Sequence, residues 1–471
     1  MAQSPNILFF LAEHHRWDWL GSNPSIPLRT PNLDRIAEDG VQFNECRCSS
    51  PLCAPSRAGL ATGLRYHRAG VPDNQTDLNP GRNTFMKELR DAGYRVAAVG
   101  KTDLHKKSLL HGITGWSDRL RQLGFTETVD MCGKRDGALV AGQNEPIEPY
   151  MAWLHEHDLH HVVCEDLEKR IERDMNPVES GKGIDTRPFP LERKYQNDDF
   201  CGRKAAELLR DFPSDQPWFL QVNWGSAHPP FDAAEELVDR YKDVYFPPPV
   251  DPAEGPTDHQ AVRRQYAAML DGMDEWIGRM IDEVDKRGER ENTVIVYSAD
   301  HGEMLGDHGQ WNKCDPREPS VHVPLLVSGP GVQKGLRSDA LIELIDLGAT
   351  FLDLADVSVP EDWDARSIKP VLKGVKDSHR KVTVSALNGW RMIFDGRFKY
   401  VKNEQRPARL YDLQCDPWEQ NGASIHLCRE PELEKCPVLL FIAPCWHHLR
   451  KADRASLSPD KYTVAGRILG G

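Results

Sequence analysis

The sequence lacks any long hydrophobic run. No segment of its 471 residues approaches the roughly 20 apolar residues that a membrane-spanning helix requires. The N-terminus also lacks a basic stretch, and the apolar run from Ile7 to Ala12 is shorter than the apolar region of a signal peptide. From the sequence we therefore expect a cytoplasmic protein with no membrane partner.

Regular cysteine spacing and an excess of basic charge are absent as well. The 11 cysteines are odd in number and scattered, with no CxxC pair, which argues against a disulfide framework and against a zinc ribbon. The 59 basic and 72 acidic residues give a net charge of −13. Because a phosphate backbone attracts basic surfaces, this charge argues against a nucleic-acid partner. It remains compatible with a small anion bound in a local basic pocket.

Short apolar runs alternate with amphipathic helical patterns along most of the chain. The runs are typical of buried parallel strands, and they lie at 7–11, 94–99, 218–223, 293–297 and 324–328. The helical patterns lie at 32–39, 84–91, 198–209, 262–286 and 341–354. This alternation predicts an α/β fold in which helices cover both faces of the sheet.

Two regions depart from the alternation. Residues 125–194 are rich in charged, histidine and turn residues, and we expect an insertion over one end of the sheet, where substrate-shaping loops often lie. After about residue 373, short strands separated by turns predict an antiparallel meander over 382–402, followed by Leu410-Tyr-Asp-Leu. We therefore expect a larger domain over 1–373 and a smaller C-terminal subdomain over 374–471.

The most informative motif is CAPSRAGLATG, which runs from Cys53 to Gly63. Pro55 suits the first turn of a helix, so Cys53 is expected at a helix N-terminus, with Arg57 one turn later on the same face. A thiol, a helix dipole and a guanidinium would then meet where an anion can bind. The alternative is a buried cysteine at a structural turn. A cysteine phosphatase would need an arginine at position 59, where this chain has Gly59.

This motif resembles the hallmark of the sulfatases, a family of the alkaline-phosphatase-like superfamily. The resemblance extends over residues 6–413, with four motif blocks in the family's order. It implies that a sulfatase-maturating enzyme converts Cys53 to formylglycine, whose hydrated aldehyde is the nucleophile. It also implies a mixed, mostly parallel sheet flanked by helices, together with a smaller C-terminal α+β subdomain that contains an antiparallel sheet.

Two acid–histidine pairs are the candidate metal ligands. Asp300 and His301 end an apolar strand, and a carboxylate with an imidazole suits a divalent cation. By resemblance they are the family's second metal pair, and Glu13 and His14 stand where the family normally has Asp-Asp or Asp-Gln. With Cys53 they would hold one divalent cation, Ca²⁺ by resemblance. Because two imidazoles make the donor set softer than an oxygen cage, Mn²⁺ or another transition cation is an alternative, and Mg²⁺ also stays open.

Cationic side chains complete the expected site. Lys101 lies in Gly-Lys-Thr-Asp, which is similar to the family's Gly-Lys-x-His, and by resemblance its ammonium lies near the formylglycine. The family's histidine position is Asp103 here, so His105 is an alternative carrier of that role. By resemblance, His228 in His-Pro-Pro-Phe is a sulfate ligand and proton donor, and Lys313 is the second anion-binding lysine.

The residues and the resemblance together predict a sulfuric ester hydrolase that acts on a small-molecule or saccharide sulfate. Arg57 and the metal would hold the formylglycine, while Lys101, Lys313 and His228 would neutralise the sulfonyl oxygens. Either His228 or His105 would protonate the leaving alcohol. Two alternatives stay open: a phosphonate monoester or phosphodiester hydrolase on the same fold, and a non-catalytic anion-binding protein that has lost its metal.

Overall fold

The structure, a computed structural model, describes residues 4–141, 145–174 and 183–424. The patternless end of the expected C-terminal subdomain, residues 425–471, lies outside this part of the chain. The strands of the larger sheet are β1 (Asn6–Ala12), β2 (Gly40–Arg47), β3 (Arg95–Gly100), β4 (Glu127–Asp130), β5 (Trp218–Asn223), β6 (Thr293–Ala299), β7 (His322–Ser328), β8 (Leu336–Ser338) and β9 (Ile342–Glu343). They are ordered β4-β3-β5-β1-β6-β7-β2-β8, and β9 pairs with β2.

Five neighbouring strands, β4, β3, β5, β1 and β6, are parallel, and Ile7 of β1 lies between Phe219 and Val294. Every residue of β1, β5 and β6 is buried, as expected for strands covered on both faces. The expectation of a parallel strand at 324–328 was wrong, because β7 is antiparallel to both β6 and β2. The chain re-enters the sheet at the edge where β6 ends, so it needs no crossover connection.

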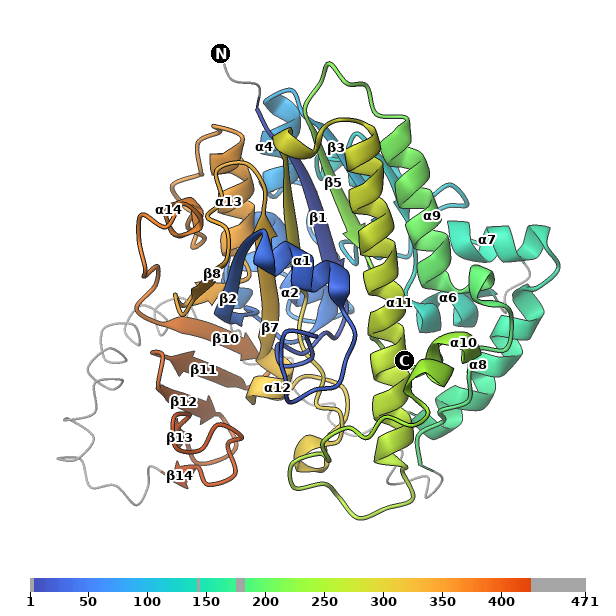
Figure 1. The fold of residues 1–471 in the computed structure, drawn as a ribbon, viewed down its shortest axis with the longest axis vertical. Helices are drawn as coiled ribbons and strands as arrows, with labels where there is room; N and C mark the ends of the chain where they lie inside the picture. The colour runs from blue at the N-terminus through green and yellow to red at the C-terminus, as the bar shows by residue number, and fades with distance from the viewer. Residues whose placement is uncertain (1–3, 142–144, 175–182, 425–471) are drawn as a thin grey trace, which may run out of the picture.

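Helices cover both faces of this sheet (Figure 1). On one face α2 (Cys53–Thr62), α4 (Phe85–Asp91) and α13 (Asp346–Leu354) pack together; on the other, α11 (His259–Lys286) packs against α1 (Pro31–Glu38) and α9 (Asn197–Arg210). Phe351 of α13 contacts Phe9 and Phe219 of the sheet, with ring centroids 5.2 Å apart in both pairs. The predicted helix at 341–354 begins only at Asp346, because Ile342 and Glu343 form β9. The predicted α/β class is confirmed.

The insertion contributes both to the sheet and to a helical layer at its side. Within residues 125–194, β4 joins the sheet edge, and it is followed by α6 (Lys134–Ala141), α7 (Pro149–Glu156) and α8 (His160–Asp174), which lie beyond α9 in Figure 1. Shorter helices are α3 (Tyr66–Ala69), α5 (Asp118–Gln122), α10 (Glu235–Val238), α12 (Glu318–Val321) and α14 (Lys369–Leu372). None of the helices in the described ranges is long and apolar enough to cross a bilayer.

A second sheet follows the larger one in the chain. It contains β10 (Thr383–Leu387), β11 (Trp390–Phe394), β12 (Phe398–Asn403), β13 (Arg409–Asp412) and β14 (Ala423–Ser424), paired antiparallel in sequence order. The predicted antiparallel meander is confirmed. The indole Nε1 of Trp390 donates to the backbone oxygen of Cys314 (3.0 Å), so this sheet supports the loop that carries Lys313.

Candidate active site

The expected site residues meet at the carboxyl-terminal edge of the parallel strands. Glu13 and His14 follow β1, Lys101 follows β3, and Asp300 and His301 follow β6. Parallel strands that point the same way end at one edge, which is where α/β folds place their sites. Helix α2 begins at this edge with Cys53, and the loop after β5 brings in His228.

Cys53 lies at the centre of the cluster. Its Sγ is 3.1 Å from Glu13 Oε1 and 3.3 Å from His301 Nε2. Burial raises the pKa of the Cys53 thiol to about 12, although the ammonium groups of Lys101 and Lys313 act in the opposite direction. The unmodified side chain is therefore a protonated thiol at neutral pH, and a protonated thiol is a poor nucleophile.

The donor set fits a divalent cation. Two overlapping groups share Cys53, and within each group the ligand atoms lie within 4.8 Å of one another: Glu13, His14, Cys53 and His228 in one, and Cys53, Asp300 and His301 in the other. The rings of His14 and His301 are edge to face, with centroids 4.5 Å apart. Two carboxylates and two imidazoles around one position form a set that first-row transition cations favour.

The electrostatics keep these donors in metal-binding protonation states. Burial alone would raise the pKa of Glu13, but its ion pair with Lys101 and the nearby positive charges hold that pKa well below its ordinary range. Burial lowers the pKa of His14 strongly and that of His301 to about 4. Both rings are therefore neutral at neutral pH, the form in which imidazole ligates metals.

Arg57 lies one turn after Cys53 in α2, as its spacing predicts. Its Nε donates to Asp300 Oδ2 (2.9 Å), and its Nη1 donates to the Lys101 carbonyl and to Asn223 Oδ1 (3.2 Å). Its Nη2 is buried without a hydrogen-bond partner in the described part of the chain. The guanidinium thus braces Asp300 and keeps one donor available for an anion.

The two lysines approach the cluster from different sides. Lys101 forms an ion pair with Glu13, and Lys313 Nζ donates to His14 Nε2 (2.7 Å) and to His228 Nε2 (3.1 Å). Burial lowers the pKa of His228, and Lys313 lowers it further, so its ring is neutral. Its Nε2 accepts a hydrogen bond from the Lys313 ammonium group. Both lysines are therefore placed to meet negative charge beside Cys53.

His105 and Asp103 occupy different environments. His105 Nε2 donates to Asp130 Oδ2 (2.8 Å), and its Nδ1 accepts the Leu110 N–H (3.2 Å), so both ring nitrogens are engaged. Asp103 is buried, with Oδ2 3.3 Å from Lys101 Nζ. The structure thus brings Asp103 beside Lys101 and engages His105 with the carboxylate that ends β4. Sequence reasoning assigned no role to Asp130.

Glu303 is a second residue that sequence reasoning missed. Its Oε2 lies 2.6 Å from His14 Nδ1, and both side chains are fully buried. Burial raises the pKa of Glu303 to about 7. The available signal was its place two residues after His301, in the same loop as a predicted metal pair.

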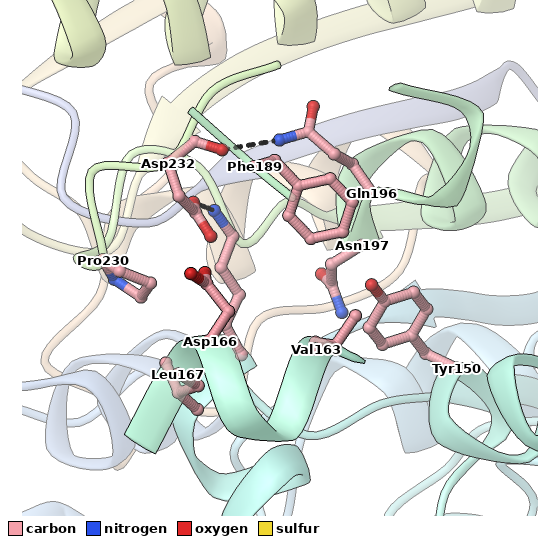
Figure 2. A pocket seen from close by; sticks show the side chains of 10 residues that line it. Tyr150, Val163, Asp166, Leu167, Phe189, Gln196, Asn197, Pro230 and Asp232 are labelled. Carbon is pink, nitrogen blue, oxygen red and sulfur yellow. Dashed lines mark hydrogen bonds and ion pairs between the residues drawn. The ribbon is translucent and has the colours of Figure 1, made fainter. Parts of the chain in front are cut away.

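A pocket lies where the insertion meets the loop after β5 (Figure 2). Asp166 and Leu167 of α8 face Pro230 and Asp232 across it, and Lys134 Nζ is 2.8 Å from Asp232 Oδ1. Gly133, next to Lys134 in the chain, lies so close to Lys101 that a Cβ there would be 3.2 Å from its Cε. The insertion therefore lies next to the active-site lysine.

Comparisons with known proteins agree with this geometry. A family model described as Sulfatase matches residues 5–357, and one described as N-sulphoglucosamine sulphohydrolase, C-terminal, matches residues 306–427. The arylsulfatase of Clostridium perfringens is 27% identical over 445 residues, which cover 88% of this chain and 89% of that protein. The choline-sulfatase of Rhizobium meliloti is 28% identical over 447 residues, which cover 88% and 81% of the two chains.

The structure of the phosphonate monoester hydrolase of Agrobacterium radiobacter matches with a TM-score of 0.76 at 22% identity, over 96% of each chain. At this identity the likeness shows the fold alone, and it confirms the predicted alkaline-phosphatase-like architecture. Because the Sulfatase model covers most of the chain, the class is a hydrolase. The chain belongs to the sulfatase family, as the motif at Cys53 predicts, and it is a sulfatase hydrolase.

Proposed function

We propose that this enzyme hydrolyses sulfate monoesters of a small-molecule or saccharide alcohol. It would use Cys53, converted to formylglycine by a sulfatase-maturating enzyme, and one divalent cation. The observation that carries the proposal is the meeting of Cys53 with two carboxylates, two imidazoles and two ammonium groups at one strand edge. A buried, protonated thiol is a poor nucleophile, whereas formylglycine at position 53 would supply one.

The cation and the modified residue would supply Lewis acidity and the nucleophile, and this chain's residues would do the rest. Glu13, His14, Asp300 and His301 would hold the cation. Arg57 orients Asp300, and its Nη2, which has no hydrogen-bond partner among the described residues, would hold the modified residue 53.

The anion-binding roles follow from the same contacts. Lys101 and Lys313 would neutralise the sulfonyl oxygens, since fixed positive charge is most effective where water is excluded. His228 Nε2, which accepts a hydrogen bond from Lys313 (3.1 Å), would take a proton from that ammonium group and pass it to the leaving alcohol. His105 remains the alternative donor, but its partners are Asp130 and the Leu110 N–H, whereas His228 is paired with Lys313 of the cluster.

We further propose that residues 1–373 form the catalytic domain and that the C-terminal subdomain supports it. The Trp390 indole bonded to the Cys314 carbonyl supports this division of roles, because it fixes the backbone next to Lys313. Substrate choice would depend on the insertion at 125–194, whose pocket adjoins the His228 loop and whose Gly133 lies next to Lys101.

The test is to coexpress the chain with a maturating enzyme and to combine mass analysis of the Cys53 peptide with assays on an aryl sulfate and an aryl phosphodiester. We expect conversion of Cys53 and faster turnover of the sulfate. Turnover by protein in which Cys53 is fully unmodified would refute formylglycine as the nucleophile. Faster cleavage of the phosphodiester would favour the alternative, a phosphonate monoester or phosphodiester hydrolase. Asn388→Ala, at an exposed turn between β10 and β11, is a control that should leave both rates unchanged.

A further inference from the structure

We propose that Glu303 fixes His14 in the tautomer that can ligate through Nε2, and that this pair tunes the site toward a transition cation such as Mn²⁺ and away from Ca²⁺. The inference rests on the proposed function, in which Glu13, His14, Asp300 and His301 hold the cation. It assigns Glu303 as a positioning residue, since it acts through His14.

Two contacts determine the tautomer of His14. An ammonium group can only donate hydrogen bonds, and Lys313 Nζ lies 2.7 Å from His14 Nε2, so Nε2 carries the lone pair. The proton of the neutral ring is therefore on Nδ1, which donates to Glu303 Oε2 at 2.6 Å. The lone pair of His14 thus points into the cluster around Cys53, as a metal ligand requires.

Glu303 is itself held in place. Its Oε1 accepts the backbone N–H of Leu305 (3.1 Å) and that of Asn312, and its side chain is fully buried. The carboxylate therefore cannot rotate to offer a different atom to His14. A carboxylate behind a ligating histidine fixes the ring orientation and raises its basicity.

The choice of cation follows from this geometry. Ca²⁺ takes six to eight oxygen ligands, whereas imidazole nitrogen suits transition cations. A site in which His14 presents a basic nitrogen, next to the imidazole of His301 (ring centroids 4.5 Å apart), gives up one oxygen position that Ca²⁺ would use. The Glu303–His14 pair is thus a selectivity element of the cation site.

An isosteric substitution tests this arrangement. In Glu303→Gln, the amide oxygen has to face the N–H groups of Leu305 and Asn312, because an NH₂ group there would meet two donors. The NH₂ group then faces His14 Nδ1 and makes it an acceptor. The ring proton moves to Nε2, and the lone pair that would bind the cation is lost.

The experiment is equilibrium dialysis of the full chain against Mn²⁺ or Ca²⁺, with metal content measured by mass spectrometry. A second readout is the visible absorption of the Co²⁺ form, which reports nitrogen ligation. We expect the wild type to prefer Mn²⁺. Glu303→Gln should lose about 10–100-fold in Mn²⁺ affinity, with a much smaller change for Ca²⁺ and an altered Co²⁺ spectrum.

Two further variants keep the inference falsifiable. His14→Gln removes the ligating nitrogen and should lower the ratio of Mn²⁺ affinity to Ca²⁺ affinity, as Glu303→Gln does. It therefore tests the Glu303–His14 pair if Glu303→Gln does not fold. Glu148→Gln is the matched control: Glu148 is also buried, and it accepts the backbone N–H groups of Tyr150 (3.1 Å) and Met151. It should keep the wild-type preference.

The outcomes separate the inference from the function on which it rests. A wild-type chain that binds neither cation overturns the proposed metal site itself. A wild type that binds Mn²⁺, with the Mn²⁺ to Ca²⁺ affinity ratio unchanged in Glu303→Gln or His14→Gln, leaves that site standing and overturns the role of the Glu303–His14 pair.

Discussion

Lys399 connects the C-terminal sheet to the larger domain through buried charge. It lies on β12 with a fully buried side chain, and its Nζ is 2.9 Å from Glu318 Oε1 and 2.9 Å from Glu419 Oε1. Glu318 belongs to α12, next to β7 of the larger sheet. Lys399→Met keeps the side-chain length and removes the charge, and we expect it to lower the free energy of unfolding substantially.

The magnitude follows from which carboxylate is left unpaired. After the substitution Glu318 keeps ion pairs with Arg47 (2.6 Å) and His322 (2.8 Å). Among the described residues, Glu419 keeps one hydrogen bond, from the Glu318 N–H (2.7 Å). Removing one partner of a buried ion pair costs about 3–5 kcal/mol of the free energy of unfolding.

The loss should depend on pH in a defined direction. Burial raises the pKa of Glu419 to about 7 even with Lys399 present, so the folded state holds this proton more tightly than the unfolded chain. Stability from this group is present at low pH and is lost as the pH rises through about 7. Without Lys399 the pKa rises further, so the deficit should be about 1 kcal/mol larger at pH 8 than at pH 6.

The assay is urea unfolding followed by circular dichroism at pH 8 and pH 6. The double variant Lys399→Met/Glu419→Gln removes the group that titrates, so its deficit should be the same at pH 8 and pH 6, and it should recover about 1 kcal/mol at pH 8. Lys376→Met, at an exposed position, is the control and should stay within about 0.5 kcal/mol of the wild type. A Lys399→Met variant within about 1 kcal/mol of the wild type at pH 8 would refute the reasoning.

Three further predictions concern the active site. Cys53→Ala should abolish turnover with an unchanged melting temperature, and retained activity would argue against the nucleophile. His228→Ala should slow the hydrolysis of esters with poor leaving groups by about 10²–10⁴-fold and that of activated aryl esters much less. His105→Gln should instead lower the melting temperature and leave the leaving-group dependence unchanged. The reverse pattern would make His105 the proton donor. Chelation should abolish turnover and weaken the binding of inorganic sulfate, both restored by adding the cation back.

The strand ends that form the site could be predicted because each carries a complete local signal. β1, β3, β5 and β6 are apolar runs that stop at polar residues, and burial on both faces produces that pattern directly. The direction of β7 could not be predicted in this way, because a buried strand has the same apolar sequence pattern whether it runs parallel or antiparallel to its neighbours. β2 was missed because its burial is interrupted at Gln42, Asn44 and Glu45, which breaks the apolar run.

The site residues likewise fall into two groups: those that a local motif predicts and those that only the fold reveals. Cys53, Arg57 and Lys101 belong to contiguous motifs whose spacing already places them at helix and strand ends. Glu303 and Asp130 act through partners 289 and 25 residues away, and a single carboxylate in a polar segment carries no local sign of such a contact. Their roles became visible only when the fold placed an imidazole beside each of them.

The charges around Cys53 explain why the cation and the anionic substrate should bind together. The guanidinium and the two ammonium groups are matched in number by carboxylates that lie at the same strand edge: the cations are Arg57, Lys101 and Lys313, and the anions are Glu13, Asp103 and Asp300. These six formal charges cancel, so these groups alone present no net positive charge to a sulfate ester. Asp103, where the family pattern has a histidine, adds one of the negative charges. Affinity for the anion would therefore depend on the positive charge of a divalent cation held by residues such as Glu13 and Asp300.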